Sequence, residues 1–273
     1  MSKTLGQYKI LFDGLNIHEE LNFFLKEKLK FNDQDTLINN ERILTKHQQN
    51  LIEQFLEQKK QGVPLDYILN STDFYENRFY VDERVLIPRP ETEILVDYVN
   101  NRLSSRAKVL DAGTGSGCIG ISIALKNPSL NVYGLDHSVD ALNVALINKI
   151  NLNVNNFYLV HADWLSSFKK ASFDLIVTNP PYIADQDPHL DNLQHEPNKA
   201  LVAKDYGLRD IRLIIEQSTE VLKRGGLLIL EHGYQQQEEV ENIFKKNHFS
   251  NVSNLKDFQE HPRITLGTLE KFI

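Results

Sequence analysis

One segment carries most of the information about the architecture: Lys108-Val109-Leu110-Asp111-Ala112-Gly113-Thr114-Gly115-Ser116-Gly117. It starts with strand character, and the apolar run Cys118 to Leu125 that follows it indicates a helix. Glycines at alternate positions between a strand and a helix let a ligand approach the backbone closely, and the N–H groups of the helix start face that ligand. The segment therefore predicts a strand, a ligand-binding loop and a helix, with loop residues Gly113, Thr114, Gly115, Ser116 and Gly117 as binding candidates.

An acidic residue follows the loop at the spacing typical of a nucleoside site. The strand-like run Val132 to Leu135 ends in Asp136, about 20 residues past the loop. A carboxylate there can accept hydrogen bonds from both ribose hydroxyls, which favours a nucleoside cofactor over a tight turn with a solvated aspartate. The dinucleotide fingerprint has glycine where this chain has Cys118, which argues against a nicotinamide cofactor.

A second motif, Asn179-Pro180-Pro181-Tyr182, follows the strand-like run Phe173 to Thr178. In α/β folds, ligands bind at the carboxyl ends of strands. The two prolines stiffen the backbone and supply no N–H, while the asparagine amide and the turn carbonyls remain free to face a ligand. A planar amino group fits such a pair of acceptors. Taken alone, the tetrapeptide is equally consistent with an ordinary proline-rich turn.

Together these motifs resemble those of the class I S-adenosylmethionine-dependent methyltransferases of the amino-methylating branch. Within that branch, Val85 to Glu93 reads VLIPRPETE and is similar to the signature of the release factor glutamine N5-methyltransferases, the PrmC/HemK family. The resemblance covers most of the chain from about residue 63 onward, in the family's order. The chain departs from the family pattern at Asn70 and Asn77, where glycines are usual, and at His195, where an aromatic residue is common. These positions concern local turns rather than the chemistry.

The resemblance implies both an activity and its reactants. It implies an S-adenosylmethionine-dependent protein-(glutamine-N5) methyltransferase, with S-adenosyl-L-methionine as the cofactor. The implied partners are peptide chain release factors, methylated on the side-chain amide nitrogen of the glutamine in their GGQ motif. The protein would then act in translation termination.

Sequence patterns divide the chain into three parts. Residues 1–72 have helical periodicity and are predicted to form an N-terminal helical substrate-docking domain; residues 73–90 are predicted to be a β-hairpin linker. In residues 91–273 strands alternate with helices, which predicts an α/β, doubly wound Rossmann-like methyltransferase sheet. In the resembled fold, Phe249 to Val252 and Ile264 to Phe272 form an antiparallel hairpin at the sheet edge.

Three more side chains are candidates for contacts with the cofactor. Asp163 and Trp164 follow the third strand, Phe157 to Val160, and so lie at the same sheet edge as the glycine loop. There an aspartate can accept from the adenine amino group while the indole covers the ring face, and the family resemblance favours this role over core packing for Trp164. Asp111 either faces the cofactor's ammonium group, directly or through water, or caps the loop amides.

The Asn-Pro-Pro-Tyr motif suggests how an amide nitrogen could be methylated. The Asn179 side-chain oxygen and the Pro180 carbonyl would each accept one N–H of the target NH₂ group, with Pro181 completing the substrate-binding turn. The nitrogen lone pair would then point at the methyl group, and positioning would supply much of the rate. Tyr182 would stack on the substrate amide or pack in a lid.

The segment of residues 183–207 is predicted to be a lid, because a polar connection of this length is usually functional in a compact domain. His189 and His195 in this segment are interpreted as solvent-exposed, and no metal site is predicted. Arg89 and Glu91 either border the substrate channel or stabilise the junction between the two domains, and the sequence leaves both possibilities open.

Composition limits the alternatives. The net charge is −7 and the pI is about 5.7, with no basic stripe, so no direct contact with nucleic acid is expected. The only cysteine, Cys118, excludes an intramolecular disulfide. The N-terminus lacks the pattern of a signal peptide and no segment is apolar enough to cross a membrane, which predicts a cytoplasmic protein.

Two rival functions remain. An adenine N6-methyltransferase acting on DNA or RNA would present an amino group to the same acceptors, but the acidic charge argues against it. A regulatory protein that only binds the cofactor has no need of an intact Asn-Pro-Pro-Tyr motif.

Overall fold

The computed structural model describes residues 3–13, 17–37, 40–102 and 106–270. The contacts divide the chain into two compact units, Met1–Ser71 and Thr72–Ile273. Each unit has a hydrophobic core built from its own residues.

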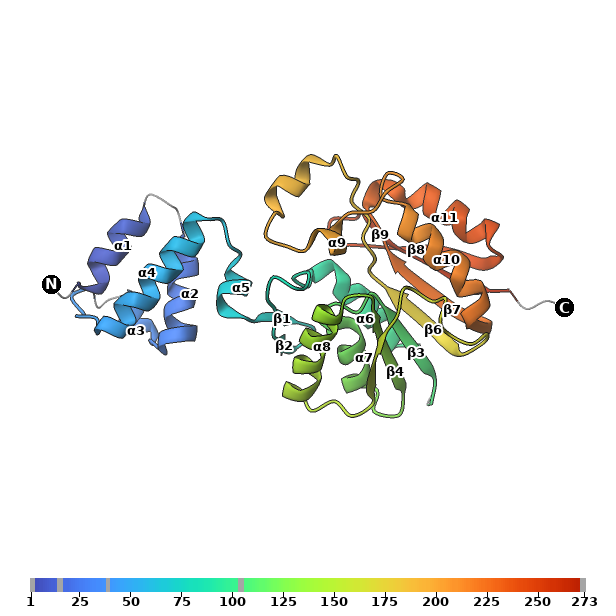
Figure 1. Ribbon diagram of the computed structural model, residues 1–273, viewed down its shortest axis with the longest axis horizontal. Helices are drawn as coiled ribbons and strands as arrows, with labels where there is room; N and C mark the ends of the chain where they lie inside the picture. The colour runs from blue at the N-terminus through green and yellow to red at the C-terminus, as the bar shows by residue number, and fades with distance from the viewer. Residues whose placement is uncertain (1–2, 14–16, 38–39, 103–105, 271–273) are drawn as a thin grey trace. The chain divides into compact units, whose positions relative to one another are not determined.

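The first unit packs helices around an apolar core (Figure 1). Its helices are α1 (Leu5–Asp13), α2 (His18–Leu29), α3 (Asp33–Leu37), α4 (Lys46–Lys60) and α5 (Leu65–Leu69). Phe24 of α2 stacks on Phe55 of α4 with ring centroids 4.4 Å apart. Helix α4 begins with a capping box, in which Thr45 and Gln48 each accept a hydrogen bond from the other's backbone N–H. Local sequence thus sets where α4 begins.

The second unit begins with a hairpin of β1 (Thr72–Phe74) and β2 (Asn77–Phe79). Phe74 and Phe79 are buried in the same cluster as Val109 of the main sheet. The segment 73–90, set apart as a linker from its sequence, therefore contributes to the core of this unit.

Residues 106–270 contain a seven-stranded sheet in the order β5-β4-β3-β6-β7-β9-β8. The strands are β3 (Lys108–Ala112), β4 (Asn131–Asp136), β5 (Phe157–His161), β6 (Phe173–Thr178), β7 (Leu222–Glu231), β8 (Phe249–Lys256) and β9 (Pro262–Leu269). Strands β3 to β7 run parallel, and β9 runs antiparallel to both of its neighbours, β7 and β8. In the register of β6 and β7, Thr178 lies beside Leu230.

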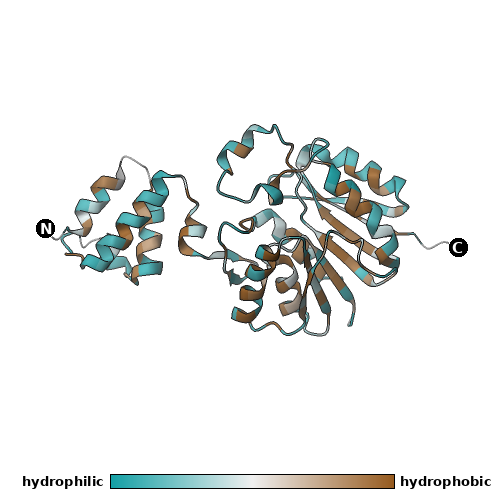
Figure 2. Cartoon of the chain, viewed as in Figure 1, coloured by the Kyte–Doolittle hydropathy of each residue, from teal (hydrophilic) through white to brown (hydrophobic). Residues whose placement is uncertain are grey.

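Helices cover both faces of this sheet (Figure 1). They are α6 (Glu93–Asn100), α7 (Cys118–Lys126), α8 (Val139–Asn151), α10 (Arg209–Val221) and α11 (Gln237–Lys246). The short helix α9 (Asn198–Leu201) belongs to the segment between β6 and α10. Successive residues of β3 point to opposite faces, so Val109 packs in the cluster that contains α6 and α7, and Leu110 packs in the one that contains α10 and α11. Both faces are thus buried, and the central strands are hydrophobic (Figure 2). The predicted doubly wound Rossmann-like fold is confirmed.

The predicted edge hairpin is present as β8 and β9, although Phe272 lies outside the described residues. It extends further than the sequence indicated, because β8 continues to Lys256. Among the helices of the described ranges, none has the length and apolar character needed to span a bilayer.

Candidate functional site

A cavity of about 440 Å³ lies where the parallel strands end. The loop after β3, the last residue of β4 and the loop after β6 all reach it. It brings together nine of the residues singled out from sequence: Gly113, Thr114, Gly115, Ser116, Asp136, Asp163, Trp164, Asn179 and Pro181. The carboxyl-terminal sheet edge is therefore the candidate ligand site.

The glycine loop forms one wall of this cavity. Gly113 and Gly115 have φ angles of +76° and +53°, in the left-handed region that favours glycine. Leu135 O accepts hydrogen bonds from Gly113 N and Thr114 N, each at 2.8 Å, which fastens the loop to β4. A β-carbon added at Gly115 would meet no described atom within 4 Å, so the loop leaves open space for a ligand.

Asp136, the last residue of β4, both lines the cavity and organises the loop. Its Oδ2 accepts from Gly115 N and its Oδ1 from Ser138 N, each at 2.9 Å. A carboxylate oxygen can accept more than one hydrogen bond, so both oxygens keep capacity for hydroxyl donors. This double role was not visible in the sequence.

The indole of Trp164 lies against the glycine loop. A β-carbon added at Gly113 would stand 3.5 Å from the six-membered ring. Trp164 Nε1 donates to Asp210 Oδ1 at 3.3 Å, and Asp210 also lines the cavity. Asp163, the preceding residue, also lines the cavity, so the cavity is bordered by an aromatic ring and a carboxylate from adjacent positions.

Asp111 contacts a loop hydroxyl and a helix N–H rather than the amides of the glycine loop. It is fully buried and does not line the cavity. Its Oδ2 accepts from Thr114 Oγ1 at 2.6 Å and from Gly120 N at 2.9 Å. Burial raises the pKa of this carboxyl to about 7, against the effect of those two hydrogen bonds, and the charge of Asp136 adds to the rise. In this structure Asp111 therefore supports the glycine loop through Thr114, and its contact with the cofactor stays a prediction.

Three other predicted residues, Gly117, Pro180 and Tyr182, also lie outside the cavity lining. Gly117 has a φ of +83° and precedes α7 as its N-cap. Pro180 is buried. Tyr182 packs against the core cluster of α10 and α11, and its hydroxyl donates to Glu231 Oε1 at 3.3 Å. Burial and the nearby Glu231 raise the pKa of Tyr182. In this structure Tyr182 packs against the core, and its stacking on the substrate amide stays a prediction.

Asn179 and Thr92 both line the cavity and are hydrogen-bonded to each other. Asn179 Nδ2 donates to Thr92 Oγ1 at 3.1 Å, and Thr92 Oγ1 donates to Glu231 Oε2 at 2.8 Å. Sequence reasoning missed Thr92 and Glu231. Thr92 belongs to the quoted VLIPRPETE segment, and Glu231 ends a strand at the site edge, but neither signal indicated a contact with Asn179.

The segment 183–207 borders the cavity through Pro197, Lys199 and Ala200. Glu196 in this segment is 8% exposed, and it accepts from Ile87 N at 3.0 Å and from the Arg89 guanidinium at 2.5 Å. Arg89 both lines the cavity and holds this segment. No group of residues that could hold a metal ion is found in the described parts of the chain.

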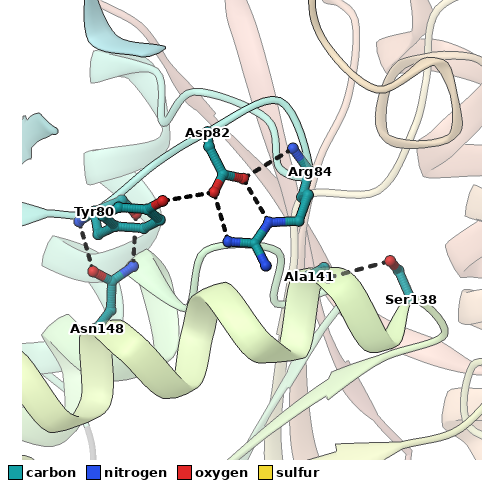
Figure 3. A network of polar contacts seen from close by, with 6 residues as sticks. All are labelled: Tyr80, Asp82, Arg84, Ser138, Ala141 and Asn148. Atoms are coloured by element: carbon teal, nitrogen blue, oxygen red, sulfur yellow. Dashed lines mark hydrogen bonds and ion pairs between the residues drawn. The ribbon is translucent and has the colours of Figure 1, made fainter. Parts of the chain in front are cut away.

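A second polar network supports the cavity wall next to α8 (Figure 3). The guanidinium of Arg84, a lining residue, contacts both carboxylate oxygens of Asp82, which also accepts from the Tyr80 hydroxyl. Asn148 of α8 accepts from Tyr80 N at 2.6 Å and donates to Tyr80 O at 2.9 Å and to Ser116 O at 2.8 Å. The segment before Val85 and the glycine loop are thereby fastened to one helix.

Comparisons with known proteins give consistent results. The family model for the Methyltransferase small domain matches residues 90–260. The release factor glutamine methyltransferase of Salmonella typhimurium is 37% identical over 227 residues, 82% of each chain. That of Pasteurella multocida is 38% identical over 274 residues, 93% of this chain and 91% of the relative. The crystal structure of a ribosomal protein L11 methylase from Lactobacillus delbrueckii subsp. bulgaricus has a TM-score of 0.52 at 21% identity, covers 70% of this chain and 84% of that one, and shows the shared fold.

Proposed function

This chain belongs to the release factor glutamine methyltransferase family, and we propose that it methylates the side-chain amide nitrogen of the glutamine in the GGQ motif of peptide chain release factors. It is an S-adenosylmethionine-dependent methyltransferase. The observation that carries the proposal is Asn179, a cavity residue with its Nδ2 occupied and its Oδ1 left to accept a hydrogen bond from a substrate amide.

The cavity has the features that the cofactor requires. The open space over Gly115 suits a ligand close to the backbone, and the carboxylate of Asp136 suits the ribose hydroxyls. Asp163 and Trp164 suit the adenine amino group and ring face. When bound, S-adenosylmethionine supplies an electrophilic methyl group, and an N–C bond to the substrate forms as the S–C bond breaks. The residues of this chain orient the reactants.

The target nitrogen is a poor nucleophile because its lone pair is delocalised into the amide carbonyl. Asn179 Oδ1 accepts one N–H of the target NH₂ group, and we assign the other N–H to the backbone carbonyl of Pro180, although Pro180 itself is buried outside the cavity lining. These hydrogen bonds turn the lone pair toward the methyl group, and holding two reactants in such a geometry is worth several kcal/mol. The nitrogen becomes acidic once methylated, so its proton passes to water and no strong general base is needed.

The proposed substrate is a protein rather than a nucleic acid. The net charge of −7 does not favour binding to phosphates. The first unit, Met1–Ser71, is a helical bundle that precedes the methyltransferase fold in the sequence, and we assign it the docking of the release factor. The predicted cytoplasmic location follows from this substrate, because release factors act on ribosomes.

Mass spectrometry tests the proposal directly. A purified release factor and duplex DNA are incubated side by side with the protein and methyl-labelled S-adenosylmethionine. We expect one added methyl group on the GGQ glutamine and none on DNA. Transfer to adenine with an unmodified release factor would overturn the assignment.

A further inference from the structure

One buried carboxylate connects with both ends of the Asn-Pro-Pro-Tyr motif. Glu231 is 2% exposed and ends β7, next to β6, from which Asn179 emerges. Its Oε1 accepts from the Tyr182 hydroxyl, and its Oε2 accepts from Thr92 Oγ1, which in turn accepts from Asn179 Nδ2. The chain of hydrogen bonds runs from the cavity wall into the protein interior.

The donors and acceptors in this series of hydrogen bonds fix which group donates in each bond. An ionised carboxylate only accepts hydrogen bonds, so the single hydroxyl proton of Thr92 points to Glu231. The lone pairs of Thr92 Oγ1 then face Asn179, and they select the NH₂ end of the Asn179 amide. Its oxygen is left for a ligand in the cavity. An amide turned the other way would offer NH₂ to the NH₂ of a substrate, and two donors make no hydrogen bond.

We propose that Thr92 and Glu231 are positioning residues, which hold Asn179 with its acceptor oxygen toward the substrate amide. This inference rests on the proposed function, because it assigns the orientation of Asn179 to the methyl-transfer step. Thr92 acts through Asn179, and Glu231 acts through Thr92.

The groups around Glu231 determine the pH at which the proposal should be tested. Burial raises the pKa of Glu231 to about 7, and the charge of Glu91 adds to the rise. The hydrogen bonds from Thr92 and Tyr182 and the charge of Arg263 act in the opposite direction. At about pH 8 the Glu231 carboxylate is mostly ionised, so Thr92 donates to it and accepts from Asn179.

The test compares Thr92→Val, which removes the hydroxyl at nearly constant volume, with Thr92→Ser, which keeps it. Single-turnover methyl transfer to a release factor is measured at about pH 8 with saturating cofactor. We expect Thr92→Val to lower the rate about 10-fold and Thr92→Ser to stay within about 3-fold of wild type. Cofactor affinity should be unchanged in both. In an Asn179→Ala background, Thr92→Val should cause no further loss, because its effect passes through Asn179.

Glu231→Gln provides a second test of the proposal. The new side-chain NH₂ can donate to Thr92 Oγ1, so that the Thr92 hydroxyl is free to donate to Asn179. We expect a rate loss similar to that of Thr92→Val, with cofactor affinity retained. Equal rates for Thr92→Val and Thr92→Ser, or a full Thr92→Val loss in the Asn179→Ala background, would overturn the positioning roles. A wild-type protein that leaves the release factor unmethylated would instead overturn the proposed function.

Discussion

Arg89 and Glu196 join two segments 107 residues apart in the sequence, through a hydrogen-bonded ion pair at 2.5 Å. The carboxylate is buried, whereas the guanidinium is about one-third exposed. The pair ties the VLIPRPETE segment to the segment 183–207, and both border the cavity.

Removing only the cation from this pair should destabilise the protein more than neutralising both partners. Arg89→Ala leaves the buried Glu196 carboxylate without its countercharge, for which we expect a loss of about 1–2 kcal/mol in the free energy of unfolding. Arg89→Ala combined with Glu196→Gln should recover part of that loss. Urea unfolding of the single and double variants measures the difference, and equal stabilities would mean that the ion pair has no net effect.

Asp136→Ala should weaken S-adenosylmethionine binding at least about 10-fold, because it removes charge-assisted acceptors for the ribose hydroxyls. It also removes the acceptors of Gly115 N and Ser138 N, so a moderate loss of thermal stability is expected. Isothermal titration calorimetry gives the affinity. Unchanged affinity in a folded variant would restrict Asp136 to organising the loop.

Asn179→Ala should lower turnover roughly 10²–10³-fold, as expected for the loss of one aligned hydrogen-bonding group in a transition state. Cofactor affinity should change far less, and the adjacent prolines should preserve the turn. Single-turnover kinetics with thermal unfolding as a control separates chemistry from folding. Near-normal turnover would remove Asn179 from the mechanism.

Asp111 should make stability depend on pH in a predictable direction. Its pKa is raised from 3.8 to about 7 in the folded protein, so the folded state binds the extra proton between these values. Its contribution to stability is therefore fully present below about pH 4 and is lost as the pH rises through about 7. Relative to Asp111→Asn, the wild type should become less stable between pH 5 and pH 8, as measured by urea unfolding. A constant difference would show that Asp111 titrates normally.

Deletion of residues 1–71 should spare cofactor binding, because the cores of the second unit contain none of those residues. Methylation of an intact release factor should fall strongly, since the proposed docking surface is lost. A short Gly-Gly-Gln peptide should be a poor substrate for both forms. Wild-type rates of the truncated enzyme on the full-length release factor would assign the bundle another role.

The sequence predicted the features that local residue order determines. Gly113 to Ser116, Asp136 and Asn179 line one cavity because each lies at the end of a recognisable strand or just after it, and parallel strands end at one edge. The contact between Thr92 and Glu231 spans 139 residues and depends on which strands are neighbours, which no local pattern contains. The sequence does not distinguish the two roles of Asp111 for a similar reason: whether it faces a ligand or the interior depends on how α7 packs against the loop.

The pairing of Thr178 with Leu230 also determines where the chain can tolerate a change in length. Neighbouring residues of a strand face opposite sides of a sheet, so inserting or deleting one residue within β6 or β7 would turn Asn179 or Glu231 away from the other. Insertions in the surface loop between β8 and β9 leave that pairing untouched and cost little closure entropy. Length variation among relatives should therefore be concentrated in such loops, and the two strands that carry Asn179 and Glu231 should keep a constant number of residues.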